Sequence, residues 1–209
     1  MHDAFQSAVF VFFIQATLIF ILCLIIFNGL EDFAIILPPN LPVMGARFIC
    51  SILMHLQVEG DMRQGLVMMK YATNHPKEFS NPFYAFFVAL MQSMGGLASE
   101  ICCIVFLCSL TDPINIIIRF VAFASIGKID NFYYAALPAD NKLKQNESMC
   151  EDIEIENHSR DLERNNERPL SSYIGRFIFK SIRLLYASFI FYFLPYLAIF
   201  IPQLWEMSK

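Results

Sequence analysis

Long uncharged stretches alternate with shorter polar segments along this chain, and the first of them predicts a membrane helix. Residues 4–30 form a run of twenty-seven residues without Lys, Arg, Asp or Glu. An α-helix rises about 1.5 Å per residue, so about 20 residues cross a hydrocarbon core of about 30 Å. The run is long enough to span a bilayer, and it is too long for the h-region of a secretory signal.

The following segment predicts a helix of a different kind. Three prolines between residues 38 and 42 turn the chain, because proline cannot continue a helix. In residues 43–73, apolar side chains recur at helical spacing among charged ones, and Gly60 leaves open whether this is one helix or two. We expect an amphipathic helix, too charged to span, that lies along the interface or packs on the bundle. Its polar side carries Arg47, Glu59, Asp61, Arg63, Gln64 and Lys70.

Three further segments complete the predicted membrane domain. Residues 83–110 are a second span, after which Asp112 and Pro113 are suited to cap and begin a new helix. Residues 113–137 are either a span or a re-entrant or interfacial helix, because the cleanest apolar part is short and Lys128, Tyr133 and Tyr134 follow it. Residues 173–209 hold a final span with a basic start and a short tail.

A hydrophilic, acidic loop at residues 138–172 separates the membrane domain, residues 1–137, from this last span. Such a charged segment cannot bury enough apolar surface to pack a core. The sequence therefore predicts an all-α, polytopic helical membrane protein. We expect about four transmembrane helices, or three if residues 113–137 are interfacial, plus the amphipathic interfacial helix.

The composition agrees with a membrane protein and argues against a nucleic-acid-binding protein. Among the 209 residues, 56% are hydrophobic and 16% are charged, whereas ordinary soluble domains have about 25% charged residues. The net charge of −4 argues against a nucleic-acid partner. The expected partners are the lipid bilayer and other membrane protein subunits, or further copies of this chain.

The distribution of basic residues suggests an orientation. With four spans at these positions, Lys and Arg gather on the face that receives residues 31–82 and 139–172, so both termini are expected outside and both large loops inside. Asn146 and Asn157 begin glycosylation acceptor patterns that favour the opposite orientation. We give the basic residues more weight, because such tripeptides arise by chance in Asn- and Ser-rich loops.

Glu100, Arg119 and Gln92 are the candidate intramembrane polar site. Charged groups within a span are costly and by default suggest a functional site. Glu100 would lie about 18 Å from the turn at residues 111–113, and Arg119 about 9 Å, so antiparallel helices could bring them together. The pair is either part of a pathway for ions or protons, or a buried ion pair that fixes helix register. We favour the structural role.

The basic start of the last span has a simpler interpretation than a voltage sensor. Arg176, Lys180 and Arg183 recur at i, i+4 and i+7, which is not the every-third-residue spacing of voltage-sensing helices. We expect these side chains to reach lipid headgroups, with their aliphatic stems in the apolar layer.

No motif in the sequence indicates catalysis, a metal site or a cofactor. The histidines are scattered, and the cysteines lie mostly in apolar stretches without the spacing of a zinc site. We therefore expect a non-catalytic subunit or scaffold of a larger membrane assembly. The alternative is a self-associating ion or proton channel or carrier that uses Glu100 and Arg119.

Overall fold

The computed structural model describes residues 2–29, 35–75, 79, 81–138, 141, 144 and 170–208. In these residues the chain is all-α, with no strand. The long helices are α1 (His2–Gly29), α2 (Leu41–Asn74) and α3 (Pro82–Leu107). They are followed by α4 (Pro113–Gly127), α5 (Ile129–Ala136) and α7 (Leu170–Leu185).

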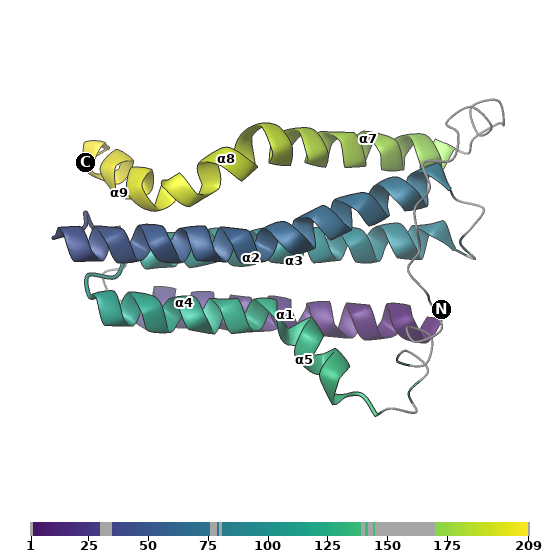
Figure 1. Ribbon diagram of the computed structural model, residues 1–209, viewed down its shortest axis with the longest axis horizontal. Helices are drawn as coiled ribbons and strands as arrows, with labels where there is room; N and C mark the ends of the chain where they lie inside the picture. Colours follow the sequence, from purple (N-terminus) through teal and green to yellow (C-terminus); the bar gives the residue numbers. More distant parts are fainter. Residues whose placement is uncertain are drawn as a thin grey trace.

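The helices form three layers (Figure 1). The long helices α2 and α3 lie side by side in the middle, with α1 and α4 on one side and the last helical segment on the other. The main core lies where α2, α3 and α4 meet, and it includes Met54 and Met62 of α2, Phe106 and Leu107 of α3, and Phe123 of α4.

Three helices begin with the same local signal, a polar cap followed by proline. The Oδ1 atom of Asn40 accepts a hydrogen bond from the Val43 amide at 3.0 Å, and that of Asn81 accepts one from Phe83 at 3.1 Å. The Asp112 carboxylate accepts a hydrogen bond from the Asn115 amide at 3.1 Å. Such caps satisfy amides that have no partner inside the helix. The predicted cap at Asp112 is confirmed.

The predicted fold class is confirmed. Within the described residues, four helices are long and apolar enough to cross a membrane: Phe5–Leu24, Leu41–Asn74, Pro82–Leu107 and Tyr173–Met207. Their length and composition mark the chain as a membrane protein.

The four helices are not the four expected, because α2 is among them and the shorter α4 is not. Helix α2 is a single helix of 34 residues that packs against α3 along the bundle, so of the two positions expected for residues 43–73 the structure has the packed one. The two sides of the helix follow the expectation only in part, because Arg63, Gln64 and Lys70 are exposed as expected but the N-terminal half differs. Ile49, Leu53 and Leu56 are exposed, whereas Arg47 is only 1% exposed. Among the residues of the expected polar side, Arg47 is the one that is buried in the protein interior.

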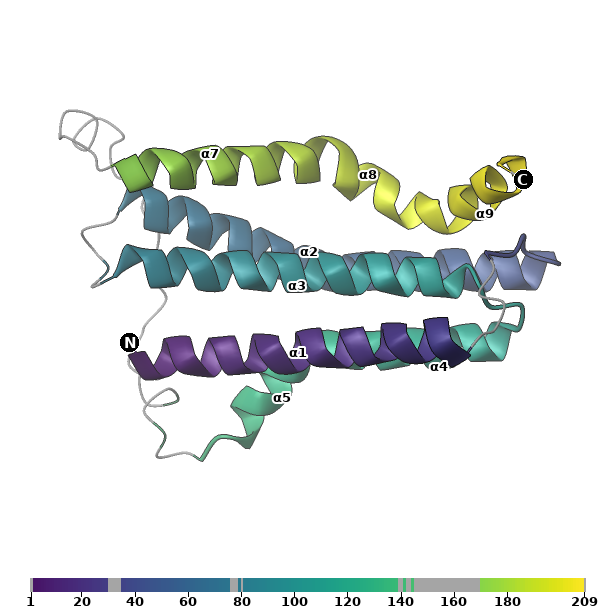
Figure 2. The same cartoon turned by 180° about the vertical axis from the view of Figure 1, so that it is seen from behind.

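Helix α4 is the short apolar helix of the bundle. Its 15 residues extend about 22 Å, less than the core of a bilayer. The chain turns at Lys128, and α5 leaves the bundle at an angle (Figure 2). The break between α4 and α5 separates the apolar part of residues 113–137 from the part that contains Tyr133 and Tyr134.

The last helical segment is irregular around its prolines. After α7 come the π-helical turn η2 (Tyr186–Ile190), the short α8 (Phe191–Phe193), the 3-10 turn η3 (Leu194–Tyr196) and α9 (Leu197–Met207). Pro202 has no amide hydrogen, so the Ala198 carbonyl four residues earlier loses its helical partner. The Cys108 thiol donates a hydrogen bond to this carbonyl, at a sulfur–oxygen distance of 3.6 Å.

The two termini lie at opposite ends of the bundle (Figure 1). The start of α1 is at the end where α7 begins, and the C-terminus is at the end where α4 begins. This does not fit the expectation that both termini share one face, because α2 runs along the bundle in addition to α1, α3, α4 and the last helical segment. The two glycosylation acceptors and most of the acidic loop lie outside the described residues.

A buried His55–Glu100 site in the bundle core

Helix α2 carries a stripe of polar residues that faces the protein interior. Arg47, Ser51 and His55 are spaced four residues apart, so they lie on one face of the helix, one turn after another. Their exposed fractions are 1%, 0% and 6%. We call these three residues the polar stripe of α2.

The first residue of the stripe is completely engaged with backbone carbonyls. The Arg47 Nη1 atom donates a hydrogen bond to the Ile36 carbonyl at 2.8 Å. Its Nη2 and Nε atoms donate to the Leu110 carbonyl at 2.8 and 3.3 Å. Arg47 therefore ties the segment before α2 to the turn between α3 and α4.

The second residue of the stripe fastens the last helical segment. The Ser51 hydroxyl donates a hydrogen bond to the Pro195 carbonyl at 3.1 Å. This carbonyl belongs to the 3-10 turn η3, where regular α-helical hydrogen bonding is interrupted. Membrane proteins tolerate such breaks when neighbouring side chains satisfy the released backbone groups.

The third residue of the stripe meets the carboxylate of α3. The Nδ1 atom of His55 lies 2.7 Å from the Oε1 atom of Glu100, within hydrogen-bonding distance. Glu100 is 0% exposed. The remaining polar atoms of the pair, His55 Nε2 and Glu100 Oε2, are buried and have no hydrogen-bond partner among the described residues.

Tyr186 completes the surroundings of the pair at the π-helical turn η2. Its hydroxyl is buried without a hydrogen-bond partner in the described part of the chain, and it interacts electrostatically with Glu100, Glu59 and Arg63. The Phe191 ring packs at 5.3 Å from the His55 ring and at 6.1 Å from the Tyr186 ring. π-Helical turns within α-helices are frequent at functional sites.

This arrangement is chemically suited to hold a proton. Imidazole and carboxylate are both groups that accept and release protons, and the 2.7 Å separation of His55 Nδ1 and Glu100 Oε1 is a hydrogen-bonding distance. The buried atoms without partners provide positions where a proton or a water molecule could be received. Cys103 is a further titratable group that interacts electrostatically with Glu100.

The structure does not bring Glu100 and Arg119 together. Arg119 is exposed on α4, and its guanidinium carbon lies 5.4 Å from the centre of the Phe106 ring. Ile116 and Phe123 form the buried face of α4, and Arg119 is not on it. Gln92 lies eight residues from Glu100 on α3, about 12 Å along the helix, and it lines a separate cavity together with Asp61.

The three basic residues of α7 differ in their surroundings. The Arg176 Nη2 atom donates a hydrogen bond to the Asn74 side-chain oxygen at 2.9 Å, so it holds α7 against the end of α2. Lys180 and Arg183 are exposed. Contact of these side chains with lipid headgroups stays a prediction.

The sequence contained a signal for the partner of Glu100. A polar residue every fourth position on an otherwise apolar helix marks one face, and in a membrane protein that face turns toward the interior. No role for His55, Ser51 or Tyr186 followed from the sequence. Their meeting with Glu100 depends on which helices are neighbours.

No group of three or more His, Cys, Asp or Glu side chains that could hold a metal ion occurs among the described residues. Comparison of the chain with protein-family models, with curated proteins and with solved structures finds no match.

Proposed function

We propose that this protein is a multi-pass integral membrane protein that binds and relays protons through the His55–Glu100 pair. The observation that carries this proposal is a fully buried carboxylate, 0% exposed, paired with an imidazole while both groups keep a buried atom without a partner in the described chain. Buried Glu and His residues in membrane helices commonly mark proton pathways.

Neighbouring groups supply a route toward the pair. Tyr186 lies in the electrostatic field of both Glu100 and the Glu59–Arg63 ion pair. Arg63 is exposed, and its ion pair with Glu59 joins residues one turn apart on α2. In the proposed path, a proton enters near this ion pair and reaches Glu100 by way of Tyr186.

Proton flux into reconstituted vesicles tests the proposal. Vesicles with the purified protein and an internal pH dye should acidify when a membrane potential is imposed, more rapidly than vesicles without protein. The Glu100→Gln variant keeps the size of the side chain but cannot ionise, so its flux should fall to that of protein-free vesicles. Tyr186→Phe should reduce the flux.

Asp112→Asn is the matched control. It also replaces a carboxylate by an amide, at an exposed helix cap, and asparagine caps helices as well as aspartate does. Its flux should equal that of the parent. Absence of flux in the parent, or equal flux in Glu100→Gln, would reject the proposal.

A second proposal, compatible with the first, is a non-catalytic subunit of a larger membrane assembly or a self-associating protein. It is supported by Tyr192, which is 63% exposed near the middle of the candidate span Tyr173–Met207. At that depth lipid offers no partner for its hydroxyl, whereas another protein could.

Native sizing after extraction in mild detergent tests this second proposal. A particle much heavier than the 24.1 kDa chain with its micelle is expected, and Tyr192→Phe should shift it toward the monomer. Met54, Met62 and Met69 of α2 are buried within the chain itself, so they require no partner. Recovery of the parent only as a monomer would exclude the assembly.

A further inference from the structure

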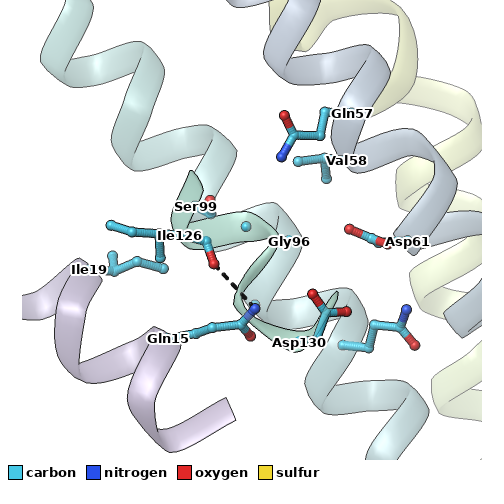
Figure 3. A pocket seen from close by; sticks show the side chains of 12 residues that line it. Gln15, Ile19, Gln57, Val58, Asp61, Gly96, Ser99, Ile126 and Asp130 are labelled. Atoms are coloured by element: carbon cyan, nitrogen blue, oxygen red, sulfur yellow. Dashed lines mark hydrogen bonds between the residues drawn. The ribbon is translucent and has the colours of Figure 1, made fainter. Parts of the chain in front are cut away.

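A second polar site lies outside the His55–Glu100 pair, where α1, α2, α3 and the α4–α5 junction meet. It is a cavity of about 40 Å³, which exceeds the space that one water molecule requires. Figure 3 shows the side chains that surround it. The polar residues among them are Gln15, Gln57, Asp61, Gln92, Ser99 and Asp130.

The polar groups at the cavity are rich in oxygen atoms. Asp61 and Asp130 provide two carboxylates that interact electrostatically with each other. Gln15 and Gln57 donate through their amide nitrogens to the carbonyls of Ile126 and Ala124, at 3.4 and 2.8 Å. Each amide oxygen therefore remains available as an acceptor.

Two observations indicate that this cavity is more than a group of neighbouring acidic residues. Ser99 is 2% exposed and lines the cavity, yet its hydroxyl has no hydrogen-bond partner within the described residues. The Oδ1 atom of Asp130 is also buried without such a partner. Buried polar atoms normally have partners, so these two point to a bound species.

The backbone around the cavity adds to its negative potential and keeps it open. Helix α4 ends here, and the C-terminal end of a helix carries partial negative charge. Gly127 and Gly96 leave space that larger residues would fill. A Cβ atom on Gly127 would lie 3.0 Å from the Gln57 nitrogen, and one on Gly96 would lie 3.2 Å from a Val58 methyl group.

We propose that this cavity binds a hard metal cation, of the alkali or alkaline-earth type, through oxygen ligands. Carboxylate, amide and hydroxyl oxygens are the ligands that such cations prefer. No Cys or His lines the cavity, so softer metals such as zinc lack their usual ligands. The cation would balance the two carboxylates in a setting where unpaired charge is costly.

Thermal unfolding of the purified full-length chain in detergent tests the site. Na⁺, K⁺, Mg²⁺ and Ca²⁺ are added separately as chlorides, with choline chloride as the reference. At least one metal cation should raise the unfolding midpoint by about 5–10 °C at about one hundred times its dissociation constant. Calorimetric titration of the same cation should give a saturable binding curve.

Substitutions of cavity residues test whether the shift of the unfolding midpoint arises from cation binding in the cavity. Asp61→Asn and Asp130→Asn should each abolish the shift, and Ser99→Ala should weaken binding. Asp112→Asn removes a carboxylate elsewhere and should respond like the parent. If one aspartate variant fails to fold, the other aspartate variant and Ser99→Ala still report on the site.

Three outcomes would overturn the inference. In the first, no metal cation shifts the parent beyond choline chloride. In the second, both aspartate variants respond like the parent. In the third, acidification alone stabilises the parent, which would make the cavity a protonation site. None of these readouts depends on proton flux, so the proposed function and the cation site can fail independently.

Discussion

Arg47 and the His55–Glu100 pair are polar centres on the same face of α2, eight residues and about 12 Å apart. They differ in how many of their buried polar atoms have hydrogen-bond partners. Arg47 gives three hydrogen bonds to two carbonyl oxygens, and no nitrogen of Arg47 is buried without a partner among the described residues. The pair keeps one bond at 2.7 Å and two unpartnered atoms.

The two centres also differ in whether their side chains can exchange a proton. Arginine does not lose its proton in proteins, and a carbonyl oxygen does not gain one. Arg47 is therefore suited to a fixed role that holds the end of the bundle together. His55 and Glu100 can both change protonation, so only the second centre is suited to exchange. This difference predicts which substitutions affect stability and which affect proton movement.

Removal of the Arg47 guanidinium should have the largest effect on stability. In Arg47→Met, the carbonyls of Ile36 and Leu110 lose their donor, and each buried group without a partner costs about 1–3 kcal/mol. The free energy of unfolding should fall by about 2–6 kcal/mol. Thermal unfolding followed by the fluorescence of Trp205, the only tryptophan, measures the change. An unfolding midpoint equal to that of the parent would contradict the fixed role.

The loss of stability when the His55–Glu100 pair is disrupted should depend on whether one or both side chains are replaced. His55→Leu leaves the Glu100 carboxylate buried alone, which costs up to about 3–5 kcal/mol, less whatever protonation recovers. The double variant with Glu100→Leu removes both polar groups and should be more stable than His55→Leu. Unfolding of both variants under one set of conditions tests this order. A double variant less stable than the single one would contradict this order, because it would mean that Glu100 stabilises the fold even without His55.

Ser51, which lies between the two centres, should have an intermediate effect. Ser51→Ala removes the donor to the Pro195 carbonyl and should cost about 1 kcal/mol. Ser125→Ala is the matched control, because Ser125 is exposed and bonds only to the Val121 carbonyl of its own helix. Equal midpoints for the two variants would mean that Ser51 does not fasten the last helical segment.

Arg119 should have the smallest effect of the four. Arg119→Met loses only the contact with the Phe106 ring, which is worth about 0.5–1 kcal/mol at an exposed position. The comparison with Arg47→Met contrasts a buried with an exposed arginine under the same substitution. A loss as large as that of Arg47→Met would indicate that Arg119 has a partner in the membrane.

The sequence predicted the helical class and part of the local structure because these depend on neighbouring residues. The run at residues 4–30 requires an apolar surrounding, and Asp112 with Pro113 starts a helix wherever it is placed. Glu100 was identified as a site residue for the same reason, since a charge within an apolar stretch must be satisfied. These inferences need no knowledge of which helices touch.

Tertiary structure decided the partner of each buried group and the side of α2 that faces the interior. In water, charged residues on a helix indicate the outer face, whereas in lipid they indicate the inner one, and the interpretation of residues 43–73 followed the first rule. The distance along two helices placed Glu100 and Arg119 at compatible depths but gave no information on their rotation. Which residue meets Glu100 is set by the packing of α2 against α3, a long-range arrangement that residue spacing alone does not encode.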